Sequence, residues 1–175
     1  MEDRKLQLDL FWCRAFPLIQ AVFFALEAKP QAVGAKEMAQ DIRRLWQQCR
    51  EYLQIKLAPI ADDLSYAAAA WVDEMMLANT ANIFPEWHIA PLQLFYCDDL
   101  NAGVRFFDLY SKVSNGSLGA IKAWWFQLWL GLGFRGASDK QPTEIFSRNQ
   151  PIIIDSQVVA KRKNTSSLFD FLVCY

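Results

Sequence analysis

The sequence has few of the residues on which enzymes and metalloproteins usually depend. Its 175 residues include one histidine, His88, and four cysteines without CxxC spacing. A zinc site needs several such ligands close together, and a nucleophilic cysteine needs a neighbouring base. The Glu-x-x-His repeats of di-iron helical bundles are also missing. We therefore expect no metal and no cofactor, and we interpret His88 as a packed or surface residue.

A surplus of either charge and a complete membrane span are also lacking. The net charge is −1, so the composition does not indicate nucleic-acid binding. The chain does not begin with the pattern of a signal peptide, and the scattered cysteines indicate thiols in a reducing compartment. Ala15 to Leu26 is too short to span a bilayer, and Leu118 to Phe134 contains Lys122 and Gln127. We interpret both stretches as core helices.

Apolar residues are abundant: hydrophobic residues make up 53% of the chain and aromatic residues 14%, which excludes disorder as the main state. Apolar positions recur every three or four residues, the pattern of amphipathic helices. Helices are expected at about 4–28, 35–57, 64–79, 92–100, 104–113 and 121–132, with Pro17 kinking or splitting the first. We predict an all-α fold of about six to eight helices. An irregular C-terminal arm, with a short β-branched run at 152–154, is expected after residue 136.

Four tryptophans on these apolar stripes should be largely buried: Trp71, Trp124, Trp125 and Trp129. The central stretch is Leu64 to Asn79, an alanine-rich helix that carries Asp73 and Glu74 among apolar residues. A carboxylate in such surroundings is costly unless it is hydrogen-bonded or paired. Two interpretations remain open for the pair: hydrogen bonding to a neighbouring loop or helix N-terminus, or a direct role in a partner site. Asp62 or Asp63 should cap the first turn of this helix.

One stretch formally matches the GxGxxG motif of dinucleotide-binding proteins, from Gly131 through Gly133 to Gly136. Such a site needs a strand before the motif and a helix after it. Here a tryptophan-rich helix comes first and polar sequence follows. We therefore interpret the glycines as the C-terminal cap of a helix.

Several short motifs, in order and spacing, resemble the DotU/TssL (IcmH-like) family of bacterial type VI and type IVB secretion systems. They are Ala15-Phe16-Pro17-Leu18, Tyr66 with Ala69-Ala70 and Asp73-Glu74, Trp87, Leu94-Phe95, Ala102-Gly103 with Phe106-Phe107, and Leu130 with Gly133-Phe134-Arg135-Gly136. By this resemblance the candidate partner-binding or structural residues are Asp73, Glu74, Trp87, Phe106, Phe107, Gly133, Phe134 and Gly136. Ala137 and Ser138 depart from the aromatic and basic residues usual after the family's turn.

The resemblance implies a helical cytosolic domain of two packed small bundles, here residues 1–136, followed by a possibly membrane-proximal arm, 137–175. It implies a non-enzymatic scaffold on the cytoplasmic side of the inner membrane, of type VI rather than type IVB. The implied partners are an IcmF/TssM-type inner-membrane protein and baseplate components. A homodimer is a separate expectation. The chain would reach the membrane through a longer C-terminus or through its partner. Lys161-Arg162-Lys163 before apolar residues has the order of a cytoplasmic membrane border.

Two other interpretations remain from the sequence. One is a helical protein–protein interaction module of some other complex. The other is a small helical enzyme that uses its acidic pairs.

Overall fold

The computed structural model describes residues 2–28, 32–78, 84–98 and 102–136. In these ranges the regular structure is helical, without a strand, so the predicted all-α class is confirmed there. The elements are α1 (Glu2–Leu10), a π-helical turn (Phe11–Ala15), α2 (Phe16–Ala28), α3 (Ala32–Leu57), a 3-10 turn (Ala58–Ile60), α4 (Ala61–Ala78), α5 (Pro85–Ile89), α6 (Leu92–Cys97), α7 (Ala102–Ser111) and α8 (Ser117–Gly131). The expected arm, its β-branched run and its basic cluster lie outside the described residues.

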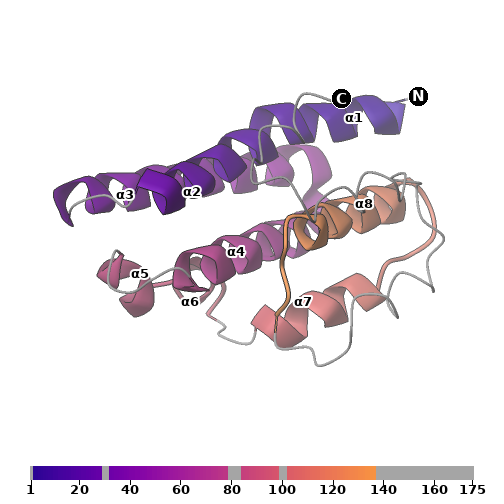
Figure 1. Cartoon of the computed structure of the whole chain (residues 1–175). Helices are drawn as coiled ribbons and strands as arrows, with labels where there is room; N and C mark the ends of the chain where they lie inside the picture. The colour runs from indigo at the N-terminus through magenta and orange to yellow at the C-terminus, as the bar shows by residue number, and fades with distance from the viewer. Residues whose placement is uncertain (1, 29–31, 79–83, 99–101, 137–175) are drawn as a thin grey trace, which may run out of the picture. The chain divides into compact units, whose positions relative to one another are not determined.

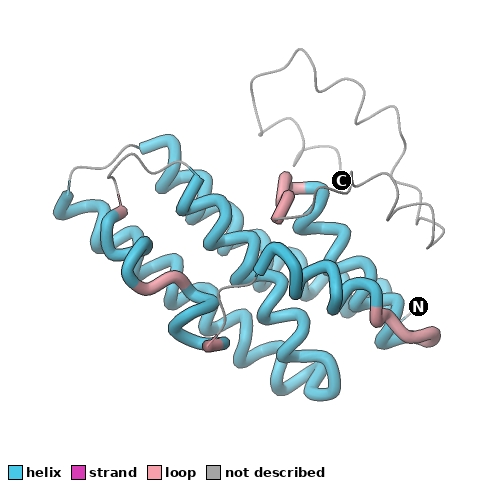
Figure 2. Tube along the Cα trace, turned by 90° about the horizontal axis from the view of Figure 1, so that it is seen from below, coloured by secondary structure: helices cyan, strands magenta, loops and turns pink. Residues whose placement is uncertain are grey.

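Most of the other helices pack against α4. In Figure 1, α2 and α3 lie above it and α7 lies below it, and α4 also contacts α5, α6 and α8. The tube in Figure 2 shows the same helices from below. Twelve of the 18 residues of α4 are buried, among them the four consecutive alanines from Ala67 to Ala70. Since these alanines carry almost no side chain, neighbouring helices can approach closely and bring large rings against α4.

The expected six to eight helices in two small bundles are not confirmed. If α1, the π-helical turn and α2 are taken as one continuous helix, the described residues contain five helices of ten or more residues. The remaining two, α5 and α6, have five and six residues. Because α4 contacts helices from both halves of the chain, the described residues share one core.

The first helix continues through Pro17, so the split that the sequence allowed does not occur, but a π-helical turn interrupts its α-helical geometry directly before the proline. The turn before the proline widens into a π-helical turn, in which the N–H of Phe16 donates to the carbonyl oxygen of Phe11. A proline ring would clash with the carbonyl four residues earlier in a regular α-helix, and the wider turn relieves that clash. The π-helical turn therefore accommodates Pro17 without breaking the helix.

This continuity changes the membrane question. The helix from Arg4 to Ala28 has 25 residues and, by length and composition alone, could cross a membrane. The expectation that this region is too short is corrected, because it counted only Ala15 to Leu26. In the structure α2 packs against α3. Of the 18-residue segment of this helix with the highest mean hydropathy, 33% is buried.

The tryptophan prediction is confirmed at three of four positions. Trp71, Trp125 and Trp129 are fully buried, whereas Trp124 is only partly buried. The indole N–H of Trp125 donates to the carbonyl oxygen of Leu64 on α4 at 2.8 Å. Trp129 lies between Trp71 and Trp125, with ring centroids 5.1 and 5.2 Å away. The stripe of α8 that faces the core thus excludes Trp124.

The acids at the start of α4 bind side chains, while the predicted cap is not observed. Asp62 Oδ1 accepts from Gln54 Nε2 at 2.7 Å. Asp63 Oδ2 lies 2.6 Å from the Nζ of Lys122, which is buried on α8. This ion pair joins α4 to α8 and supplies the partner that a buried lysine requires.

Replacing Trp125 by alanine should lower the free energy of unfolding by about 3–5 kcal/mol, since it removes a fully buried ring and its hydrogen bond. Trp124→Ala is the matched control on the same helix and should cost clearly less, because its ring is partly exposed. Urea denaturation followed by circular dichroism measures both. Equal losses would contradict the assignment of the buried stripe.

Candidate functional site

Asp73 lies at the centre of the first of the two contacts that the acidic pair of α4 makes with distant segments. Its carboxylate is almost completely buried, with 2% exposure. Oδ1 accepts from the indole Nε1 of Trp87 and from the backbone N–H of Leu92, and Oδ2 accepts from the backbone N–H of Gln93, each at 2.8 Å. The two backbone donors belong to the first turn of α6, where N–H groups have no partner within the helix. Since Pro91 at the N-cap makes no side-chain cap, Asp73 caps α6 from another helix.

Arg43 of α3 joins this contact. Its guanidinium carbon lies 4.4 Å from the centroid of a Trp87 ring, and its Nη2 donates to the carbonyl oxygen of Ala90. The sequence did not reveal Arg43, because a guanidinium stacked on a distant tryptophan follows no fixed spacing. The segment that contains α5 and α6 is therefore held from α3 and from α4.

Burial dominates the electrostatics of Asp73. Desolvation raises the pKa of this carboxyl from its usual 3.8 to about 6. The hydrogen bonds from Gln93, Leu92 and Trp87 and the charge of Arg43 act in the opposite direction and limit the rise. At neutral pH the carboxyl is mostly ionised, the form that can accept all three N–H groups.

Glu74, the next residue, makes the second contact. Its Oε1 accepts from the backbone N–H of Arg135 and its Oε2 from that of Gly136, both at 2.7 Å. These donors lie in the turn after α8, and the carboxylate binds them as a pair. Glu74 is partly buried. Both acids therefore make the hydrogen bonds of the first interpretation, to a helix N-terminus and to a loop, and a direct role in a partner site stays a prediction.

The turn that Glu74 binds ends α8 with a glycine in the left-handed region. Gly133 has φ +101°, its N–H donates to the carbonyl oxygen of Leu130, and the N–H of Phe134 donates to that of Trp129. These two bonds form a Schellman cap. The GxGxxG match is thus a helix C-terminus, as the sequence analysis predicted, and no helix among the described residues follows it.

Phe134 anchors this turn in an aromatic cluster. Its buried ring lies 4.2 Å from that of Phe106 and 6.2 Å from that of Phe107, measured between centroids. Behind it, Gly136 has φ +59°, and a Cβ at this position would lie 2.9 Å from the Cα of Gly103. The backbone of the turn therefore touches the backbone of α7 at a point where only glycine fits.

The eight candidate residues from the sequence fall into these two contacts. Asp73 and Trp87 form the first. The second contains the remaining six: Glu74, Phe106, Phe107, Gly133, Phe134 and Gly136. Adjacent residues on α4 bring the two groups together, although their members are spread over more than sixty positions of the chain. Whether any of them touches a partner stays a prediction.

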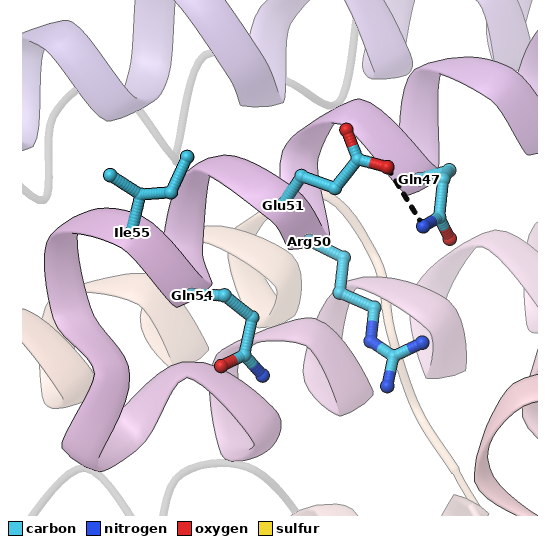
Figure 3. Close-up of a pocket in the computed structure, with 5 residues that line it drawn as sticks. All are labelled: Gln47, Arg50, Glu51, Gln54 and Ile55. Atoms are coloured by element: carbon cyan, nitrogen blue, oxygen red, sulfur yellow. Dashed lines mark hydrogen bonds between the residues drawn. The ribbon is translucent and has the colours of Figure 1, made fainter.

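Two observations on the described residues concern possible chemistry. Within the ranges that the structure describes, no group of three His, Cys, Asp or Glu residues could hold a metal ion, and His88 is exposed. Figure 3 shows a shallow depression whose lining residues all come from α3: Gln47, Arg50, Glu51, Gln54 and Ile55. Gln47 Nε2 donates to Glu51 Oε1 at 3.0 Å. Residues of a single helix provide no opposing wall to enclose a substrate.

The fold and its two contacts define an all-α protein organised on one alanine-rich helix with an acidic pair. A family model described as "Type VI secretion system protein DotU" matches residues 14–149. The match covers most of the chain, so the protein belongs to the DotU family and is a component of a secretion system. It includes every candidate residue and extends past the domain boundary expected at residue 136. Comparisons with curated proteins and with solved structures gave no match.

Asp73→Ala should lower the free energy of unfolding by about 3 kcal/mol or more, because three donors lose their acceptor in a buried place. Asp73→Asn should cost less, since its amide oxygen still accepts, although its NH2 group faces a donor. Glu74→Ala should also cost less, about 1 kcal/mol, because water can reach the exposed turn. Urea denaturation measures the free energy of unfolding of the three variants. An Asp73→Ala protein that unfolds at the same urea concentration as the parent would contradict the expected order of stability losses.

The raised pKa of Asp73 predicts a pH dependence of definite sign. Between about pH 4 and pH 6 the folded protein holds this proton while the unfolded chain has lost it, so the free energy of unfolding falls as pH rises. The fall should reach at most roughly 3 kcal/mol and level off above pH 6. The measurement is the difference between the parent and Asp73→Asn, determined by urea denaturation across this range. A difference that does not change with pH would exclude the shift.

Gly136→Ala should destabilise the protein by about 2–4 kcal/mol, because it combines a left-handed φ with a backbone clash against Gly103. Gly131→Ala is the control in the same turn region. Its added Cβ meets nothing within 4 Å and its φ is not positive, so it should be neutral or stabilise by up to about 1 kcal/mol. Thermal melting measures both variants. Equal melting temperatures would contradict the close approach of Gly136 to Gly103 of α7.

Proposed function

We propose that this protein is a non-enzymatic adaptor in the membrane complex of the secretion system, on the cytoplasmic side of the bacterial inner membrane. Membership of the DotU family is the observation that carries the proposal. The geometry of the acidic pair supports it, since both carboxylates bind backbone N–H groups of their own chain. Asp73 and Glu74 thereby help to set the positions of α6 and of the turn after α8.

The partners that we propose are an IcmF/TssM-type inner-membrane protein and components of the baseplate, in a type VI system. Their docking face would include α5 and α6, where three large apolar side chains are exposed: Ile89, Leu94 and Phe95. Large apolar side chains that are exposed together on one surface are typical of protein interaction sites. Arg43 and Asp73 fix the position of this face. Arg43 binds the carbonyl oxygen of Ala90, and Asp73 binds the N–H of Leu92, on either side of the connection between α5 and α6.

The proposal also covers how the protein reaches the membrane. We propose that it associates there through a longer C-terminus or through its partner, with the arm 137–175 next to the membrane. Basic residues on the cytoplasmic side of an apolar segment support this orientation.

Affinity purification from cells that also make the IcmF/TssM-type protein of the same bacterium tests the proposal. Phe95→Glu should reduce the recovered partner by about tenfold, because it places a charge in the apolar face. Ile55→Glu is the matched control, an equally simple change at an exposed apolar residue of α3. Thermal melting should show both variants as stable as the parent.

Equal recovery with Phe95→Glu and Ile55→Glu would reject the docking face. Failure of the parent to recover the partner would reject the partner itself.

A further inference from the structure

Arg50 of α3 is a half-buried cation without an acidic partner. Its guanidinium carbon lies 5.8 Å from the centroid of a ring of Trp46, which is buried beneath it. No carboxylate in the described part of the chain lies within ion-pair distance of this guanidinium. Arg44, by contrast, pairs with Asp41 at 2.9 Å. The N–H donors of Arg50 are therefore available to a group from outside the chain.

Trp46 connects this cation to the apolar face of α6. The centroid of its ring lies 4.5 Å from that of Tyr96, which in turn lies 4.8 Å from that of Phe95. Phe95 is 67% exposed and Tyr96 is half-buried. This series of contacts keeps the guanidinium and the exposed phenyl ring within about 15 Å of each other, the length of roughly three helical turns. One short segment of a partner can cover both.

The side of α3 that borders α6 carries positive charge. Arg43 and Arg50 are seven positions apart and so lie on the same side of the helix. Glu51 does not neutralise them, because its side chain points to another side of α3 and accepts from Gln47 (Figure 3). Ile55 also points away from Arg50 in this view. The positive side of α3 and the apolar face of α6 thus form one continuous surface.

We propose that Phe95, Tyr96 and Arg50 bind a partner segment that carries an Asp or Glu side chain within about three helical turns of a large apolar one. The carboxylate of the partner binds the guanidinium of Arg50, and the apolar side chain packs on Phe95 and Tyr96. This inference rests on the proposed docking face and adds the chemistry of the segment that docks there.

An arginine held in this way selects a carboxylate. Its planar N–H groups match the two oxygens of a carboxylate, and stacking on Trp46 fixes the plane before the partner arrives. A purely apolar segment would cover the guanidinium and leave its charge without a partner, which is costly. A basic segment would be repelled. The surface therefore discriminates against segments of the wrong charge as well as attracting the right one.

Charge reversal at Arg50 tests the ion pair in the affinity purification with the IcmF/TssM-type protein. Arg50→Glu should reduce the recovered partner by about tenfold, because two carboxylates then face each other. Arg44→Glu is the matched control, the same change on the same helix at an exposed arginine already paired within the chain. It should leave recovery unchanged. Thermal melting should show both variants as stable as the parent.

Two milder variants separate charge from geometry. Arg50→Lys keeps the charge but loses the planar donors, so recovery should fall by only about two- to threefold. Arg50→Gln removes the charge. Recovery of the partner by the parent should decrease as sodium chloride is raised from about 0.1 to 0.5 M, because salt screens an ion pair. Recovery by Arg50→Gln should depend less on salt.

Zero-length cross-linking gives an independent readout. A carbodiimide joins a lysine amine to a carboxylate that it touches, and it does not couple a guanidinium. In the complex of Arg50→Lys, mass spectrometry should find the introduced amine joined to an Asp or Glu of the partner. The parent complex should show no link at this position. A complex of Arg50→Lys that forms without this link would contradict a direct contact.

The outcomes distinguish this inference from the docking face on which it rests. If Phe95→Glu lowers recovery while Arg50→Glu and Arg44→Glu leave it equal, the docking face stands and the acidic segment is rejected. If Phe95→Glu and Ile55→Glu give equal recovery, both proposals fail. If Arg50→Glu lowers the melting temperature, the salt series decides. Equal salt dependence of the parent and Arg50→Gln would overturn the ion pair.

Discussion

Two adjacent carboxylates on α4 determine where two distant segments of the chain lie. Neighbouring residues on a helix point about 100° apart, so Asp73 and Glu74 can each face a different part of the protein. Asp73 binds the start of α6, and Glu74 binds the turn after α8. Backbone N–H groups left free at helix ends and turns need acceptors when they are buried, and each acid satisfies two of them. Removing Asp73 would leave two buried N–H groups of α6 without their acceptor, whereas the turn that loses Glu74 could still bind water.

The alanines of α4 make this arrangement possible. Because Ala67 to Ala70 fill so little space, tryptophans of other helices reach the backbone of α4 itself: Trp46 Nε1 donates to the carbonyl oxygen of Ser65 and Trp125 Nε1 to that of Leu64. A larger side chain here would push the rings outward and break these bonds. The aromatic residues thus provide the volume of the core and α4 provides the polar acceptors, which explains why such different residue types are concentrated in one small domain.

Sequence alone predicted the features that depend on local pattern. The long helices, the glycine cap after α8 and the satisfied state of the acidic pair follow from helical periodicity, glycine chemistry and the cost of a buried charge. Features that depend on distant partners did not follow. Arg43 stacks on Trp87 and Lys122 pairs with Asp63, and in each case the partner is far away in the chain. The π-helical turn before Pro17 was missed because a proline indicates strain without indicating how the helix relieves it.

The internal use of the acidic pair changes how loss of function should be interpreted. Asp73 contributes no free oxygen to the surface, yet it supports the segment that presents Ile89, Leu94 and Phe95 to solvent. A substitution of Asp73 would displace this segment and weaken a complex without the acid ever touching the partner. A residue that contacts the partner should weaken the complex while leaving the free energy of unfolding unchanged. Substituting a residue that supports this segment, such as Asp73, should lower both the affinity for the partner and the free energy of unfolding. Stability measured beside binding therefore separates the two roles that the sequence left open for this pair.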